Sequence, residues 1–231
     1  MPNTNLSSST QEKEKIEVKV CGLVRTEDIE GTLALGVDYI GLNLWEKSPR
    51  CVSPTMLREL LDSIPVGRRV YVDVQPDRYK IDEAIAADFD FFQLHFDPSL
   101  SEARIFAERC LEQIDISRLW LAPRVLTGMH WPQWLIPYAN AFLCDGSKGG
   151  EYGGTGRVAD WASFSVLKHT FPEKKWILAG GLGPDNVVAA ASLLPHIMDL
   201  NSGVEIRPGI KDFKKLARAL EAIRQVEVCP D

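Results

Sequence analysis

The sequence lacks the features that mark several large classes of protein. No apolar run reaches the roughly 18 residues that a helix needs to cross a bilayer, and the polar residues 1–15 contain no apolar core of a secretory signal. Lys and Arg number 26 against 32 Asp and Glu, and this net charge of −6 does not favour a surface for nucleic acid. We therefore expect a cytoplasmic protein that binds neither nucleic acid nor a membrane.

Residues for disulfide and metal chemistry are also scarce. The five cysteines are odd in number and scattered, which does not suit a disulfide framework. The four histidines have no short ligand spacing and no Cys-x-x-Cys pair occurs, so no metal site is expected. The G-x-x-x-x-G-K-[ST] motif of nucleotide hydrolases and the G-x-S-x-G motif of α/β-hydrolases are absent as well.

What the sequence does contain is a regular alternation of two kinds of segment after a polar tail. Residues 1–15 lack apolar periodicity and are expected to be disordered, whereas residues 16–231 are expected to form one catalytic domain. Short runs rich in β-branched and aromatic residues predict buried parallel strands. They lie at Val18–Cys21, Tyr39–Leu44, Arg69–Val74, Phe91–His95, Leu119–Val125, Ala141–Asp145, Trp176–Ala179 and Ile197–Leu200.

Helices are expected after the strands. Thr26–Leu35 has Thr26 in place for an N-cap, and Ser53-Pro54 starts the next helix. Further helices are expected at Asp77–Ala87, Ser101–Gln113, Trp131–Pro137, Asp160–His169, Pro184–Leu194 and Asp212–Arg224. This alternation predicts an α/β protein, a single-domain (β/α)8 TIM barrel. The alternative is an open doubly wound sheet, but no Gly-rich dinucleotide turn follows the first strand.

In such a barrel the active site lies at the C-terminal ends of the strands. Cys21 closes the first strand beside Lys19, where a thiol with a lowered pKa would serve as a base or nucleophile. The alternative is that Cys21 is a small buried core residue. Asp145 ends the sixth strand, and it is either a general acid with a raised pKa or a loop residue that makes turn hydrogen bonds.

Glycine-rich loops follow three of the last strands. Residues 146–157 come directly after Asp145, and their glycines suit a mobile flap that closes over a substrate. AGGL at 179–182 and NSGVE at 201–205 follow the last two strands, where barrels commonly bind phosphate. Because glycine lets backbone N–H groups approach an anion closely, these two loops predict a phosphate site.

Six short motifs at strand ends point together to one known family. They are VKVCG (18–22), KSPR (47–50), QLH (93–95), Asp145 with GGTG (153–156), LAGGL (178–182), and SGVE with PGIKD (202–205 and 208–212). In this order the chain resembles the phosphoribosylanthranilate isomerase family of tryptophan biosynthesis. The resemblance extends over residues 17–224.

The resemblance implies an enzyme that converts N-(5-phosphoribosyl)anthranilate to 1-(2-carboxyphenylamino)-1-deoxyribulose 5-phosphate, an Amadori rearrangement without a cofactor. It implies that Cys21 is the general base at the sugar C2 and that Asp145 is the general acid at the ring oxygen. Arg50 would pair with the anthranilate carboxylate, and the loop glycines would hold the 5′-phosphate. The expected substrate contacts are Lys19, Arg50, Gln93, His95, Gly154, Gly180, Gly181, Ser202 and Gly203.

The chain departs from the family's usual residues around the pocket at Asp73, Phe96 and Asn201. If Phe96 points inward, it either stacks on the anthranilate ring or occupies the space of that ring, and the other alternative is that it packs outward. Stacking or outward packing is favoured over occlusion. A paralogue that isomerises another aminosugar phosphate and a silent barrel that only binds a phosphorylated ligand remain alternatives, although phosphate binding needs neither Cys21 nor Asp145. The expected partner is a phosphorylated sugar, and the chain is expected to be a monomer or a homodimer.

Overall fold

The fold comes from a computed structural model that describes residues 15–126, 129–145 and 161–226. The predicted tail at 1–15, apart from Lys15, lies outside these residues, and so do the predicted flap at 146–157 and Gly154. Lys15 itself forms an exposed ion pair with Asp38, with its Nζ 2.6 Å from Oδ1.

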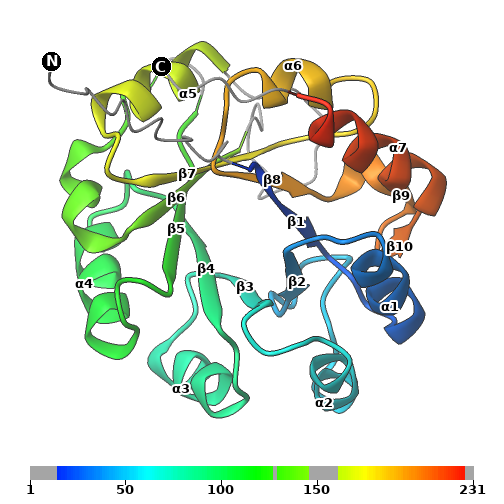
Figure 1. The fold of residues 1–231 in the computed structure, drawn as a ribbon. Coiled ribbons are helices and arrows are strands. Elements are labelled where there is room, and N and C mark those ends of the chain that lie inside the picture. The colour runs from blue at the N-terminus through cyan, green and yellow to red at the C-terminus, as the bar shows by residue number, and fades with distance from the viewer. Residues whose placement is uncertain (1–14, 127–128, 146–160, 227–231) are drawn as a thin grey trace, which may run out of the picture.

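Eight parallel strands pair in chain order and close into a barrel, because β1 also pairs with β8 (Figure 1). They are β1 Glu17–Cys21, β2 Tyr39–Asn43, β3 Arg69–Val74, β4 Phe91–Phe96, β5 Leu119–Pro123, β6 Ala141–Asp145, β7 Lys175–Ala179 and β8 Ile197–Leu200. The predicted TIM barrel is confirmed, and the closure rules out the open doubly wound sheet.

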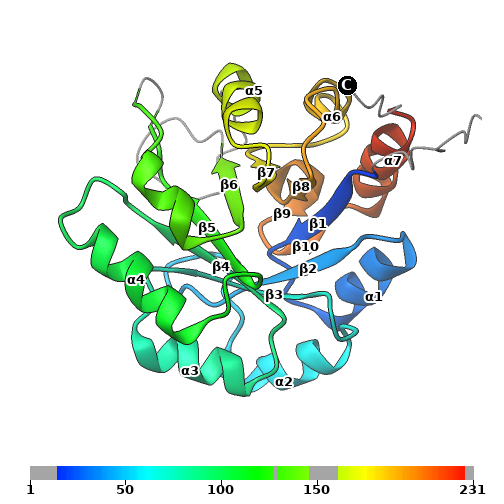
Figure 2. The same ribbon diagram turned by 60° about the vertical axis from the view of Figure 1, so that its left-hand side comes forward.

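The helices lie outside the ring of strands (Figure 2). They are α1 Thr26–Ala34, α2 Pro54–Asp62, α3 Arg78–Ala86, α4 Ala103–Gln113, α5 Trp161–Thr170, α6 Val187–Ala191 and α7 Phe213–Arg224. Between β8 and α7 lie the short 3-10 helix η2 Ser202–Val204 and a small hairpin of β9 Glu205–Arg207 and β10 Ile210–Lys211. No helix in the described part of the chain is long and apolar enough to span a membrane.

Three local predictions about helices are wrong. Arg25, not Thr26, occupies the N-cap position of α1. The segment 131–137 contains a 3-10 helix, η1 Gln133–Tyr138, because Pro137 has no N–H to continue an α-helix. The helix expected at 184–194 is shorter than predicted, because α6 extends only over Val187–Ala191. A turn precedes it, in which the Asn186 side chain accepts a hydrogen bond from Gly183 N (2.9 Å).

Alternate residues of each strand point into the barrel or outward to the helices. The inward residues form a compact apolar layer that includes Val70, Val72, Ala141, Leu143 and Ile177. The outward residues pack with the helices into a second and larger core. Side chains at the strand ends are therefore held between two filled layers.

Three aromatic rings fill the N-terminal end of the barrel interior. The ring centroids of Tyr39 lie 5.4 Å from Phe91 and 5.3 Å from Trp120, and those of Phe91 and Trp120 are 4.9 Å apart. The Tyr39 hydroxyl donates to Glu17 Oε1 at 2.9 Å. These three rings, the aromatic floor, close the barrel on the side opposite the strand ends that carry the polar residues.

Phe96 packs outward, so stacking and occlusion, the two inward alternatives, are both wrong. Its ring is fully buried in the outer core, 5.2 Å from the ring of Phe106 on α4. His95, its neighbour on β4, points to the opposite side.

We expect Phe96→Leu to lower the free energy of unfolding by about 1 kcal/mol while KM stays unchanged. The physical reason is that the lost ring belongs to the packing between β4 and α4. Thermal melting and steady-state kinetics on the same preparation test this, and a change in KM at unaltered stability would contradict it.

Candidate active site

A cavity opens at the C-terminal ends of the strands. Its polar lining consists of Cys21, Asn43, Trp45, Asp73, Gln93, His95, Asp145, Gly180, Gly181, Asp199, Asn201 and Ser202. Most of the substrate contacts expected from the sequence are in this set. Lys19, Arg50 and Gly203 are not in this set, and Gly154 lies outside the described residues.

Lys19 and Cys21 share the inward face of β1, because they are alternate residues of one strand. Lys19 is fully buried, and its Nζ donates to Asp199 Oδ2 on the neighbouring strand β8 at 2.7 Å. Burial alone would lower the pKa of Lys19, but Asp199 and Cys21 together outweigh burial, and the pKa is raised. The strand end therefore holds a buried ammonium group next to a thiol.

The pKa of the Cys21 thiol is raised, which corrects the lowered value expected from the sequence. Burial is the main cause, and the positive charge of Lys19 offsets it only in part. Lys19 thus acts in the expected sense, but desolvation of the thiol prevails. A thiolate at this position is a stronger base than an exposed one and is less populated.

Asp145 closes β6 and is partly exposed at the cavity. Strands β1 and β6 are not neighbours in the barrel, so the carboxylate and the Cys21 thiol approach the cavity from different sides. An acid and a base in this arrangement are able to act on different atoms of one ligand. His95 on β4 lies between them in the strand order, and burial lowers its pKa to about 3.

His95 is therefore neutral near pH 7, and its contact with Gln93 agrees with that state. The amide nitrogen Nε2 of Gln93 lies 2.9 Å from Nε2 of His95. An amide nitrogen only donates, so the ring nitrogen accepts and carries no proton. The Oε1 atom of Gln93 is buried and has no hydrogen-bond partner among the described residues.

The loops after β7 and β8 form the other end of the cavity. Gly180 and Gly181 have φ values of 100° and 60°, which favour glycine, and both line the cavity. Ser202 begins η2, and its buried hydroxyl has no partner within the described chain. Gly203 packs so closely on the neighbouring loop that a Cβ there would lie 2.1 Å from Leu182 O. The predicted phosphate loops thus lie against each other.

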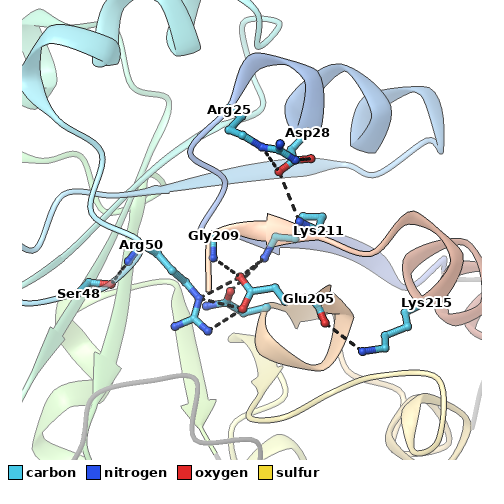
Figure 3. Close-up of polar contacts among 9 residues, drawn as sticks. Arg25, Asp28, Ser48, Arg50, Glu205, Gly209, Lys211 and Lys215 are labelled. Carbon is cyan, nitrogen blue, oxygen red and sulfur yellow. Dashed lines mark hydrogen bonds and ion pairs between the residues drawn. The ribbon is translucent and has the colours of Figure 1, made fainter. Parts of the chain in front are cut away.

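Arg50 follows β2 and is held by a residue that sequence analysis did not single out for this task. Its Nε lies 2.9 Å from Glu205 Oε1 and its Nη2 lies 2.7 Å from Oε2 (Figure 3). Both side chains are buried. Burial would raise the pKa of Glu205, but Arg50 and Lys211 outweigh it, and the pKa is lowered.

Lys211 completes this buried group of charges. Its Nζ donates to Glu205 Oε1 at 2.9 Å and to Asn201 Oδ1 at 3.1 Å. Gly209 N also donates to Glu205 at 3.1 Å, so one carboxylate joins the loop after β2 to the hairpin after β8 (Figure 3). The PGIKD motif contains Lys211, which is the only signal in the sequence that could have pointed to it.

Asp73 follows the inward-facing Val72 on β3, is buried, and lines the cavity as well. The Tyr71 hydroxyl donates to its Oδ2 at 2.7 Å, and Val74 N donates to its Oδ1 at 2.7 Å. These two bonds fix the orientation of the carboxylate. Burial nevertheless raises its pKa, because it outweighs the hydrogen bonds from Tyr71 and Val74.

Comparison with known proteins relates this chain to one enzyme family. The family model of N-(5′-phosphoribosyl)anthranilate (PRA) isomerase matches residues 18–222. An enzyme of that name from Zymomonas mobilis subsp. mobilis is 34% identical over 216 residues, which cover 90% of this chain and 98% of that protein. One from Nitrosomonas europaea is 35% identical over 223 residues, covering 92% and 97%.

Solved structures agree with the sequence comparison. The phosphoribosyl anthranilate isomerase of Thermus thermophilus superposes with a TM-score of 0.75 at 30% identity and covers 90% of this chain and 98% of that one. Another such isomerase, solved in complex with reduced 1-(o-carboxyphenylamino)-1-deoxyribulose 5-phosphate, has a TM-score of 0.70 at 25% identity, with coverage of 91% and 100%. Since sequence and barrel agree over nearly the whole described chain, it belongs to the phosphoribosylanthranilate isomerase family.

Proposed function

We propose that this protein isomerises N-(5-phosphoribosyl)anthranilate to 1-(2-carboxyphenylamino)-1-deoxyribulose 5-phosphate in tryptophan biosynthesis. The observation that carries the proposal is the placement of Cys21 and Asp145 in one cavity whose far end is formed by the glycine loops of β7 and β8. Family membership over residues 18–222 supports the same reaction. We expect it to run in the cytoplasm, with the chain as a monomer or homodimer.

In the proposed reaction Asp145 donates a proton to the furanose ring oxygen. The bond from C1′ to that oxygen breaks, and the nitrogen lone pair forms a C1′=N bond. The Cys21 thiolate then removes the C2′ proton, and the resulting enolamine tautomerises to the ketone. Oxidation at C2′ balances reduction at C1′ within one molecule, so the steps need no cofactor.

The phosphate is assigned to the loops at 180–182 and 201–204. Backbone N–H groups of the glycines and the Ser202 hydroxyl are the proposed donors. The buried, unpartnered Ser202 Oγ at the cavity wall supports this assignment, since a buried hydroxyl is costly without a partner.

Arg50 is the proposed ligand of the anthranilate carboxylate. Glu205 binds the edge formed by Nε and Nη2, and the other terminal nitrogen, Nη1, is turned away from Glu205 (Figure 3). A guanidinium group has five donors in one plane, so it binds a second carboxylate while the first holds it in place.

We expect Glu205→Gln to raise KM for the proposed substrate about tenfold, equivalent to about 1.4 kcal/mol, with a smaller change in kcat. The amide binds the guanidinium edge more weakly than the carboxylate, so Arg50 is less well oriented. Steady-state kinetics measure the effects on KM and kcat separately. The control is Glu46→Gln, which changes an exposed carboxylate that pairs with Lys80 at 3.1 Å. An unchanged KM in Glu205→Gln would separate Glu205 from substrate binding.

The reaction itself is tested by complementation of a tryptophan auxotroph that lacks this isomerase. Growth without tryptophan is expected for the native chain and not for Cys21→Ala. Failure of the well-folded native chain to restore growth would favour a paralogue acting on another aminosugar phosphate, or a barrel that only binds its ligand.

A further inference from the structure

A lysine and a cysteine meet inside the barrel in a space that exists because one residue has no side chain. Gly41 of β2 lies opposite Cys21 in the register of β1 and β2. A Cβ at Gly41 would lie 2.9 Å from Cys21 Sγ and 3.1 Å from Lys19 Nζ. Cys21 Sγ and Lys19 Nζ therefore both pack against the backbone of Gly41, where no side chain intervenes.

The ammonium group of Lys19 also contacts a carboxylate. Lys19 and Asp199 form a pair at 2.7 Å with side chains 0% and 6% exposed. Asp199 lines the cavity, and its buried Oδ1 has no partner among the described residues. Charges at this depth are poorly screened, so each acts strongly on a neighbouring thiol.

We propose that Lys19 and Asp199 are a positioning pair with opposing effects on Cys21: Lys19 stabilises the thiolate, and Asp199 limits this effect. The two charges thereby set the fraction of Cys21 that is ready to accept a proton. The inference rests on the proposed function for its kinetic consequence, whereas its effect on the thiol is measured without substrate. Neither residue needs to touch the substrate for this role.

The other charged or titratable groups around Cys21 either bind other partners or come from other strands. Lys211 on β10 acts on the thiol, but it is bound to Glu205 and Asn201. Asp145 on β6, Asp73 on β3 and the neutral His95 on β4 line the same cavity from other strands. Among the described residues, Lys19–Asp199 is the ion pair of which both members act on Cys21.

The test measures the rate at which iodoacetamide alkylates Cys21 as a function of pH. Only the thiolate reacts, so the rate rises with pH through the pKa of the thiol. Mass spectrometry of the tryptic peptide that contains Cys21 (residues 20–25, or 16–25 when Lys19 is replaced) separates it from the other cysteines.

The two members of the pair are expected to shift this profile in opposite directions. Lys19→Met should move the midpoint upward by about 1–3 pH units, because it removes the cation and leaves Asp199 unpaired. Asp199→Asn should move it downward by about one unit, since the ammonium is left to the thiolate. The pH profile of kcat should follow the same two directions.

A purely structural ion pair would give a different result. Loss of melting temperature in both variants, with both midpoints unchanged or shifted the same way, would overturn the proposal. Gly41→Ala adds an independent arm, because its Cβ pushes the ammonium and the thiol apart and should shift the midpoint upward. If Lys19→Met does not fold, a failure of Asp199→Asn to lower the midpoint overturns the proposal by itself.

Lys175→Met is the matched control, since Lys175 is an exposed barrel lysine that pairs with Glu17 at 3.7 Å and should leave the midpoint unchanged. Failure of the native chain to isomerise the proposed substrate would refute the proposed function, and the alkylation profiles would still decide the role of the pair.

Discussion

Replacing either proposed proton-transfer group is expected to lower kcat by about 10²–10⁴, the usual contribution of a positioned acid or base. Cys21→Ala removes the base at C2′, and Asp145→Asn removes the acid at the ring oxygen. KM should change little in either variant, because neither group is assigned to ground-state binding. Steady-state kinetics on N-(5-phosphoribosyl)anthranilate measure both effects.

Matched controls distinguish chemistry from folding. Cys110→Ala changes a fully buried cysteine on α4, and Asp62→Asn changes an exposed carboxylate that pairs with Arg58 at 3.2 Å. Both should keep the native kcat. A Cys21→Ala variant with near-native kcat would show that the base is another residue.

The second large effect is expected at Gly203. A Cβ at this position would lie 2.1 Å from Leu182 O, 2.6 Å from Leu182 C and 3.0 Å from Gly183 N. These are backbone atoms, so no flexible side chain can move to make room. Gly203→Ala should therefore cost about 3 kcal/mol of stability, the upper end of overpacking costs, and Gly203→Val should cost more.

Separation of the two loops should also weaken phosphate binding, measurable by titration with inorganic phosphate and by melting with and without phosphate. Gly67→Ala is the control: its φ is +87° but a Cβ there meets nothing within 4 Å. It should lose roughly 1 kcal/mol from backbone strain and keep its phosphate affinity. Native phosphate affinity in Gly203→Val would place the phosphate elsewhere.

Much of the fold could be predicted because its signals are local. Apolar runs such as Arg69–Val74 and Ile197–Leu200 match β3 and β8 in both bounds. The prediction failed where a side chain competes with the backbone: the Asn186 turn delays α6, and Pro137 prevents an α-helix at 133–138. These failures involve single hydrogen bonds that a periodicity cannot show.

The candidate site divides in the same way. Strand ends placed Cys21 and Asp145 at the cavity, since position in a barrel follows from topology alone. The contact between Arg50 and Glu205 joins residues 155 positions apart, and no spacing in the sequence indicates it. The net pKa of Cys21 could not be predicted either, because desolvation depends on every residue packed around the thiol.

The aromatic floor of Tyr39, Phe91 and Trp120 makes the site a blind pocket within the described chain. Whatever enters at the mouth must leave by the same opening, so an incoming substrate cannot displace product from behind. Product and substrate therefore use the same opening and the same binding site, and product inhibition should be competitive. A faster chemical step would then raise kcat only until product release through this opening becomes rate-limiting.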